Sequence, residues 1–426
     1  MKICKLQTQI NHFKNALFQK MKLILTFSFI VLTTTMAFSS IIPPLKKGRW
    51  VGKLELNNET NLNFEINVGN GFYPFSFTLK NGEELVPMNE PVRIGDSISI
   101  AFSNFNSEFK FKAHNKKKIS GRWINHLKTD YSIPFQAELS KETIFPVNKN
   151  IEINQFDGKW KSQFSPHNNP YDAIGIFKQN GHSLSGTFLT ETGDFRFLSG
   201  NVSGNEMQLS GFDGSHAFYF KGRLANNQIT GSYFSGKHYQ TQWTATRNDT
   251  FELRPADSLI TVIGDPSDFS IHYKDLEGKE FQFPNSDYSG KVVILQFLGT
   301  WCANCMDETV YFKELLKKYQ DRGLEIVTIG YEIGESFEDY AHQLKMYRKR
   351  FNLEHKIIVG GNARKSSAKA DLPFLSDFTS FPTSIFVDKS GKITYVHSGF
   401  SGPSTGNYFT EYKRKIEALL EEMLND

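Results

Sequence analysis

The chain has 426 residues, more than one hydrophobic core usually supports, so we expect two or three domains. Its 49 basic and 45 acidic residues nearly balance and are scattered along the sequence. This distribution argues against a nucleic-acid partner and against a polybasic membrane arm. Aromatic residues make up 14% of the chain, and most of them are Phe in short alternating runs between Gly and Asn. Such runs are typical of β-strands.

The N-terminus has the pattern of a secretory signal peptide. Residues 21–32, MKLILTFSFIVL, place a short apolar stretch after a Lys, and small residues follow up to residue 40. We therefore predict a signal peptide over residues 1–40, with Met21 preferred over Met1 as the true start. An uncleaved anchor is the alternative, but a spanning helix needs about 20 apolar residues, roughly twice the length available here. We expect an exported protein of the periplasm or cell envelope, without a membrane span after cleavage.

The cysteines are few and close together. Once the N-terminal segment with Cys4 is removed, only Cys302 and Cys305 remain. A metal site is disfavoured, because two thiolates supply half of a tetrahedral site and no further Cys or His lies at ligand spacing. A purely structural bridge is also disfavoured, because so short a loop removes little entropy from the unfolded chain. We therefore expect redox chemistry at this pair, with no metal and no cofactor.

Two segments between residues 46 and 247 share landmarks that are 110 residues apart. The register predicts two copies of one domain, at residues 46–140 and 156–247, each followed by a linker. The matched landmarks are Gly48 with Gly158, Trp50 with Trp160, Phe102 with Phe212, Ile119 with Ile229, and Trp123 with Tyr233.

Each copy consists of short alternating runs separated by turn signals such as Asn81-Gly82. We predict two all-β repeats, each an antiparallel meander that is closed into a barrel or packed as a sandwich, since either arrangement removes exposed strand edges. The opening Gly-x-Trp of each copy resembles the first strand of lipocalin-like barrels. Trp50 and Trp160 are interpreted as core residues rather than ligand contacts.

From residue 263 the sequence alternates between strands and helices, which predicts an α/β domain over residues 263–426. Residues 291–298 and 324–331 are near-continuous apolar runs, as expected for strands that are buried on both faces. A helix with apolar residues at helical spacing follows the cysteine pair, and residues 383–396 predict a hairpin. The fold class is therefore multidomain, with two all-β repeats followed by an α/β domain.

The cysteine pair lies where a buried strand gives way to a helix. Cys302 is expected at the helix N-terminus, where unpaired backbone N–H groups favour a thiolate. Cys305 lies one turn further on nearly the same face. It can therefore resolve a mixed disulfide that Cys302 forms with a substrate.

Residues 299–308, GTWCANCMDE, resemble the active site of the exported TlpA/ResA-like disulfide reductases of the thioredoxin superfamily. Residues 380–383, SFPT, resemble the cis-proline loop of the same family, and the similarity spans the α/β domain. The resemblance implies a thioredoxin-like fold. It also implies a cis bond before Pro382 and a substrate-binding surface formed by Trp301, Phe381 and Pro382.

The same resemblance assigns chemistry to Glu308, one helical turn after Cys305. In a half-buried setting its pKa should rise, which makes it a proton donor and acceptor for Cys305. The alternative is a solvated helix residue paired with Lys313 or another neighbour. Gln296 stands where cytoplasmic thioredoxins keep a buried Asp, which places the acid–base role on Glu308.

Two positions depart from the family pattern: Asn304 replaces the Pro often found before the second Cys, and Val310 replaces a Pro that commonly follows the Glu. Asn304 leaves the start of the helix less rigid, so the family's reduction potential does not carry over.

We expect a thiol-disulfide oxidoreductase that reduces disulfides of substrate proteins and is recharged by an unidentified electron donor. An oxidase is disfavoured because Ala303 and Asn304 offer no cation to stabilise the thiolate. A thiol peroxidase is disfavoured because Cys302 lacks the activating Thr and Pro pattern and a nearby Arg. The competing hypothesis is a binding module, in which the β-repeats hold a lipid, glycan or partner and the thioredoxin-like domain is a redox-sensitive appendage.

Overall fold

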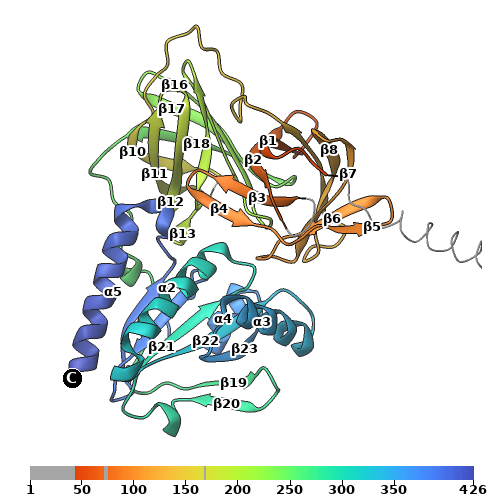
Figure 1. Ribbon diagram of the computed structural model, residues 1–426. Helices are drawn as coiled ribbons and strands as arrows, with labels where there is room; N and C mark the ends of the chain where they lie inside the picture. Colours follow the sequence, from red (N-terminus) through yellow and green to blue (C-terminus); the bar gives the residue numbers. More distant parts are fainter. Residues whose placement is uncertain (1–43, 72–74, 167–168) are drawn as a thin grey trace, which may run out of the picture.

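The structure is a computed structural model that describes residues 44–71, 75–166 and 169–426. The predicted signal peptide lies outside the described residues. The chain forms two large antiparallel sheets, followed by an α/β domain that lies below them in Figure 1. This arrangement confirms the predicted fold class. Within the described residues, no helix combines the length and apolar character needed to cross a membrane.

The first sheet is a half-barrel. Strands that are neighbours in the sheet run antiparallel, and β1 pairs with both β2 and β9. β4 and β5 form the two edges of the sheet. Its strands are β1 (Gly48–Glu55), β2 (Asn61–Gly69), β3 (Ser76–Asn81), β4 (Glu84–Pro87), β5 (Val92–Ile94), β6 (Ser97–Ala101), β7 (Ser107–Asn115), β8 (Lys118–Asn125) and β9 (Ser132–Leu139).

The second sheet closes into a barrel. β10 pairs with β18, and β12 pairs with both β11 and β14, so the ladder is continuous around the sheet. Its strands are β10 (Gly158–Phe164), β11 (Tyr171–Asn180), β12 (Ser183–Thr190), β13 (Gly193–Asp194), β14 (Leu198–Ser203), β15 (Glu206–Phe212), β16 (Ala217–Ala225), β17 (Gln228–Ser235) and β18 (Tyr239–Arg247).

The two sheets repeat one meander, in which the first strand pairs with the last and the strands follow chain order except for the two-residue β13, which pairs with β12 alone. Trp50 and Trp160 are both buried core residues. In each case the indole Nε1 donates to the carbonyl four residues earlier, Lys46 or Phe156, at 2.8 Å. The matching strand order and tryptophan contacts support the interpretation of two copies. The domain boundaries drawn from the sequence stay a prediction.

Aromatic side chains join the two sheets. Phe212, at the end of β15, packs against Phe64 and Phe109 of the first sheet, with ring centroids 4.9 and 5.6 Å apart. The rings of Phe109 and Phe135 stack at 4.1 Å inside that sheet. Because buried aromatic rings contribute strongly to packing, this shared core holds the two sheets together.

The α/β domain has a mixed sheet in the order β20-β19-β23-β22-β21-β24-β25, in which β21, β22 and β23 are parallel. Its strands are β19 (Ile271–Asp275), β20 (Glu280–Phe283), β21 (Val292–Leu298), β22 (Leu324–Glu332), β23 (Lys356–Asn362), β24 (Thr383–Val387) and β25 (Ile393–Ser398). Its helices are α2 (Ala303–Tyr319), α3 (Phe337–Phe351), α4 (Lys365–Asp371) and α5 (Asn407–Asn425).

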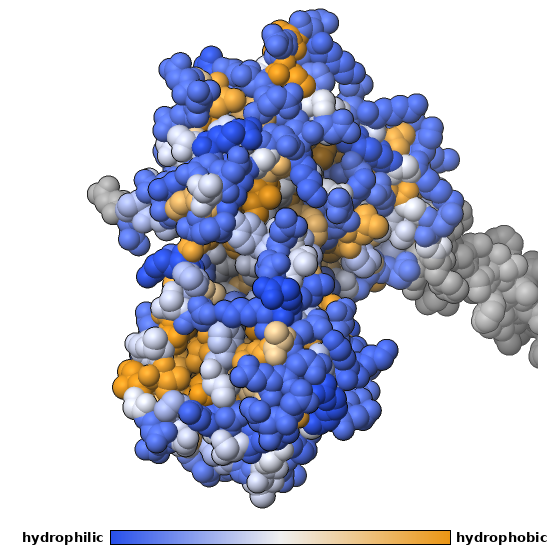
Figure 2. All heavy atoms as spheres, turned by 90° about the vertical axis from the view of Figure 1, so that its left-hand side faces the viewer, coloured by the Kyte–Doolittle hydropathy of each residue, from blue (hydrophilic) through white to orange (hydrophobic). Residues whose placement is uncertain are grey.

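Helices cover both faces of this sheet. Val292 and Ile294 of β21 share a core with α2 and α5, whereas Val293 and Leu295 share a core with α3 and α4. Every residue of β21 is buried, as the apolar run predicts for a strand covered on both sides. On the face shown in Figure 2 the surface is mostly hydrophilic, with an apolar patch on the α/β half.

Candidate active site

Cys302 is the N-cap residue of α2, four residues after the end of β21 in the loop 299–302. The backbone N–H of Cys305 donates to Cys302 Sγ at 3.2 Å. The two sulfurs form a disulfide, with the Cα atoms 5.3 Å apart. Cys302 is 8% exposed and Cys305 is 0% exposed. A substrate that approaches this pair therefore meets Cys302 first.

The three residues expected to bind substrate lie around Cys302. The Phe381–Pro382 bond is cis, and the Phe381 carbonyl oxygen lies 3.6 Å from Cys302 Sγ. Trp301 Nε1 donates to the Tyr331 carbonyl at 2.9 Å, and its ring meets Phe381 edge-on with centroids 5.7 Å apart. The structure thus brings together Trp301, Phe381 and Pro382 beside Cys302, and their role in binding stays a prediction.

Glu308 is fully buried and hydrogen-bonded within the domain. Its carboxylate accepts from Gln296 Nε2 at 2.9 Å, from Ser384 Oγ at 3.2 Å and from Tyr412 Oη at 3.3 Å. Burial raises its pKa to about 7, although these three hydrogen bonds act in the opposite direction. Lys313 donates to the Phe351 carbonyl instead. The alternative of a solvated, Lys-paired Glu308 is therefore wrong.

A second buried carboxylate, Glu332 at the end of β22, was not identified from the sequence. It accepts from the Thr300 backbone N–H at 2.8 Å and from Thr300 Oγ1 at 2.6 Å. Burial raises the pKa of Glu332 to about 8. The contact fixes the loop that carries Trp301. One sequence feature could have identified Glu332: an acidic residue ends a buried apolar run that is predicted to lie beside the strand leading to the cysteines.

The closed barrel contacts the cysteine motif directly. Asn304 Nδ2 donates to the Asp194 carbonyl at 3.2 Å, and the Asp194 carboxylate accepts from Gly402 N at 2.6 Å and Ser404 Oγ at 3.0 Å. A Cβ atom on Gly193 would lie 2.2 Å from Asn304 Nδ2. The turn between β12 and β14 therefore lies against the residues between the two cysteines.

An ion cluster around Arg196 links both sheets to α2. The Arg196 guanidinium contacts Glu84 at 2.7 Å, Asp307 at 3.0 Å and Asp213 at 3.8 Å. Burial raises the pKa of Asp307 to about 7 even though Arg196 acts to lower it. Sequence reasoning missed this cluster, because its members come from three separate parts of the chain.

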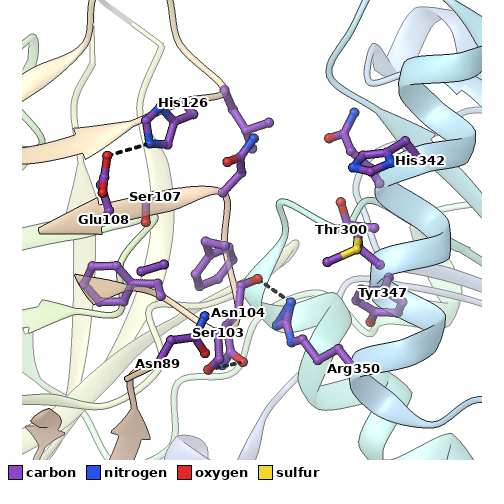
Figure 3. Close-up of a pocket in the computed structure, with 17 residues that line it drawn as sticks. Asn89, Ser103, Asn104, Ser107, Glu108, His126, Thr300, His342, Tyr347 and Arg350 are labelled. Carbon is purple, nitrogen blue, oxygen red and sulfur yellow. Dashed lines mark hydrogen bonds and ion pairs between the residues drawn. The ribbon is translucent and has the colours of Figure 1, made fainter. Parts of the chain in front are cut away.

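The half-barrel also lies beside the motif, across a cleft of about 430 Å³. The loop between β6 and β7 forms one wall, and Thr300 and α3 form the other (Figure 3). Phe105 from that loop packs in one core with Cys302, Ala303 and Met306. The cysteine pair is therefore enclosed by both β sheets. In the part of the chain that the structure describes, no group of three or more His, Cys, Asp or Glu side chains is placed to hold a metal ion.

Comparison with known proteins gives three findings. A protein-family model described as the AhpC/TSA family matches residues 263–396. The thiol-disulfide oxidoreductase ResA of Bacillus thuringiensis subsp. konkukian is 31% identical over 144 residues, which cover 33% of this chain and 72% of the relative. ResA of Geobacillus thermodenitrificans is 33% identical over 142 residues, with the same coverage.

Among solved structures, a thiol:disulfide interchange protein of the thioredoxin family from Chlorobium tepidum matches with 22% identity and a TM-score of 0.29, covering 38% of this chain and 97% of that one. The family-model match at residues 263–396 coincides with the domain that carries the enclosed cysteine pair, the buried Glu308 and the cis Phe381–Pro382 bond. The chain therefore belongs, through its C-terminal domain, to the TlpA/ResA-like thiol-disulfide oxidoreductases of the thioredoxin superfamily.

Proposed function

We propose that this protein is an exported disulfide reductase in which Cys302 attacks a substrate disulfide and Cys305 resolves the mixed disulfide. The observation that carries the proposal is the different exposure of the two cysteines at the start of α2. Cys302 caps the helix and retains exposed surface, whereas Cys305 is fully buried. Free N–H groups and the helix dipole stabilise a thiolate at the N-cap, which is the form that attacks.

The exchange balances as two successive displacements. The Cys302 thiolate bonds to one substrate sulfur and breaks the substrate disulfide, so the other substrate sulfur leaves as a thiolate that takes up a proton. The Cys305 thiolate then bonds to Cys302 Sγ and releases the first substrate sulfur. Two electrons pass from the protein to the substrate, and the protein is left with the Cys302–Cys305 disulfide. A separate dithiol donor must return those electrons before the next cycle.

Glu308 supplies the proton transfer that the second step needs. Cys305 has no exposed surface, so bulk water does not reach its thiol directly. Glu308 follows Cys305 by one turn in the same helix, and a pKa of about 7 gives it both protonation states near neutral pH. It therefore acts as the base that takes the Cys305 proton, and Gln296, Ser384 and Tyr412 hold it in place.

The residues around the cysteine pair support electron flow from the protein to the substrate. A strong oxidase needs a highly stabilised thiolate, often with a cation inside the motif, whereas Ala303 and Asn304 are uncharged. An ionised Glu308 opposes a thiolate nearby and raises the pKa of the thiol. Both features favour the reductase. Export is supported by the signal-peptide pattern of residues 21–40 and by the restriction of later cysteines to one redox pair.

Insulin reduction with a small dithiol as electron donor tests the proposal, with Cys302→Ser as the inactive control. We expect the wild-type chain to accelerate insulin reduction and the control to match the uncatalysed rate. Faster oxidation of a reduced peptide than reduction of its disulfide would indicate an oxidase instead. Consumption of hydrogen peroxide at a higher rate would indicate a thiol peroxidase. Absence of activity in all three assays would favour the binding-module hypothesis.

A further inference from the structure

The cleft between the half-barrel and the α/β domain contains a cation for which the described residues supply no counter-ion. Arg350, near the end of α3, points across the cleft towards the loop between β6 and β7 (Figure 3). Its Nη1 donates to the Asn104 carbonyl, and its Nη2 contacts Met306 Sδ at 3.3 Å. Its Nε is buried and has no hydrogen-bond partner in the described part of the chain. Among the described residues, Arg350 forms no ion pair with a carboxylate.

This arrangement is costly for the free protein. A guanidinium has five N–H donors, and a neutral carbonyl and a thioether sulfur are weak partners for it. The aromatic ring of Phe351, 4.6 Å from the guanidinium carbon, provides partial compensation. Burial nevertheless lowers the pKa of Arg350 to about 10, because the charged form is desolvated. An anion that binds beside this desolvated guanidinium would therefore stabilise its charge.

The other groups in the cleft leave this charge available. Glu108 is the only carboxylate among the described lining residues, and it is already paired with His126 at 3.2 Å. Figure 3 shows this pair away from Arg350. His342 adds a second basic side chain on the wall formed by α3, and the Gln343 Oε1 atom is buried without a hydrogen-bond partner. The cleft therefore combines an unpaired cation with polar groups that can bond to a polypeptide.

The position of the cleft connects it to the cysteine pair. Thr300, two residues before Cys302, lines the cleft, and Met306, which Arg350 contacts, directly follows Cys305. On the other side of the motif, the turn at Asp194 already covers Asn304. A polypeptide that reaches Cys302 has the cleft beside it and the barrel turn opposite.

We propose that this cleft binds an acidic segment of the substrate polypeptide, and that Arg350 determines specificity by pairing with a carboxylate close to the target disulfide. This inference rests on the proposed exchange at Cys302 and names the substrate class for it. Arg350 and a carboxylate form charge-assisted, bidentate hydrogen bonds, which are the strongest type available to this side chain. The gain is expected in substrate binding rather than in the sulfur chemistry, so it should lower KM more than it changes kcat.

Two synthetic disulfide peptides that differ only in flanking residues, Glu in one and Gln in the other, test the proposal. For the wild-type chain we expect a KM about tenfold lower for the acidic peptide at low salt. The preference should decline at about 1 M salt, where the Debye length is only about 3 Å. Arg350→Gln should reduce the ratio of the two KM values to about one, and Arg350→Lys should retain part of the preference. Lys349→Gln, an exposed change on the same helix, should leave it intact.

Equal KM values for the two peptides in the wild-type chain would overturn the inference, as would a preference that survives Arg350→Gln. If that variant fails to fold, the inference is tested by inhibiting the wild-type chain with cysteine-free peptides. A cysteine-free Glu peptide should compete with the substrate, whereas the matching Gln peptide and free glutamate should not. If free glutamate competes equally well, the cleft takes any small carboxylate and the polypeptide assignment is wrong.

The proposed reductase function can fail separately. If the wild-type chain reduces neither peptide, the exchange proposal is wrong. Fluorescence anisotropy of the labelled, cysteine-free peptides on the oxidised protein then tests the cleft alone. Tighter binding of the Glu peptide that is lost in Arg350→Gln supports the acidic site, and equal binding of both peptides contradicts it.

Discussion

Glu308→Gln separates the proposed proton transfer from the packing of the α/β core. The substitution keeps the size of the side chain and removes its titration. The amide oxygen can still accept from Gln296 and Ser384, and the amide N–H groups can face the Tyr412 hydroxyl. No buried polar group therefore needs to lose its partner, and we expect the fold to survive.

The size of the kinetic effect follows from the pKa of about 7 for Glu308. Near neutral pH both the acid and the base form are populated, which is the condition for efficient proton transfer, and its loss typically costs about 100-fold or more. We therefore expect the exchange rate of the variant to fall at least about 100-fold at pH 7. The rise of the wild-type rate through pH 7 should disappear as well.

Glu308→Gln should slow the exchange but stabilise the fold. The folded-state pKa of Glu308 lies above its ordinary value of 4.5, so the carboxyl stabilises the fold below about pH 4.5. This contribution is lost as the pH rises through about 7, because the buried carboxylate must then be charged. The Gln variant avoids that cost. It should therefore be more stable than wild type in alkaline solution, by up to about 3 kcal/mol.

Stopped-flow reduction of a small disulfide between about pH 5 and pH 9 measures the kinetic effect, and urea unfolding over the same range measures the stability. Glu314→Gln, an exposed change on the same helix, is the matched control and should behave as wild type. If Glu308→Gln equals the wild type in rate and in pH profile, Glu308 is a structural residue and its catalytic assignment is wrong.

Three further predictions concern the groups around the motif. For Glu332, with a pKa of about 8, the free energy of unfolding should decline as the pH rises through that value, and Glu332→Gln should flatten the decline in urea titrations at pH 6 and pH 9. Arg196→Gln should destabilise the chain by about 3–5 kcal/mol in thermal unfolding, because three carboxylates lose their buried counter-ion; an unchanged Tm would contradict this. Gly193→Ala should push the barrel turn away from Asn304, because the added Cβ would lie 2.2 Å from Asn304 Nδ2. The ratio of the insulin reduction rate to the reduction rate of a small disulfide should therefore rise. Gly181→Ala, also at positive φ but with no neighbour within 4 Å, should leave that ratio unchanged.

Much of the α/β domain could be predicted because its signals are local. The apolar runs at residues 291–298 and 324–331 became β21 and β22, and the hairpin at residues 383–396 became β24 and β25. Glu308 could be singled out because, one turn after Cys305, it matches the acidic residue of the motif that the sequence resembles. In the β region, alternation and a constant spacing predicted the two meanders, since a closed sheet must bury one face of each strand.

The contacts between domains could not be predicted in this way. Arg196 and Asp307 are 111 residues apart, and Asp194 and Asn304 are 110 apart. Their meeting depends on how the barrel docks on the α/β domain, which no local pattern encodes. The environment of Arg350 also depends on how the domains dock. On an isolated helix Arg350 would be an ordinary cation near the C-terminus, whereas in the folded chain it is half-buried and donates to the Asn104 carbonyl.

The most direct test of the account is covalent trapping at the cysteine pair. Cys305→Ser in the reduced state should form a stable mixed disulfide with a defined disulfide peptide. Intact mass followed by peptide mapping should place the adduct on Cys302, because the resolving thiol is absent. Cys302→Ser should give no comparable adduct, since Cys305 has no exposed surface. Adduct formation on Cys305 at the same rate would contradict the assignment of Cys302 as the attacking sulfur, and with it the proposed mechanism.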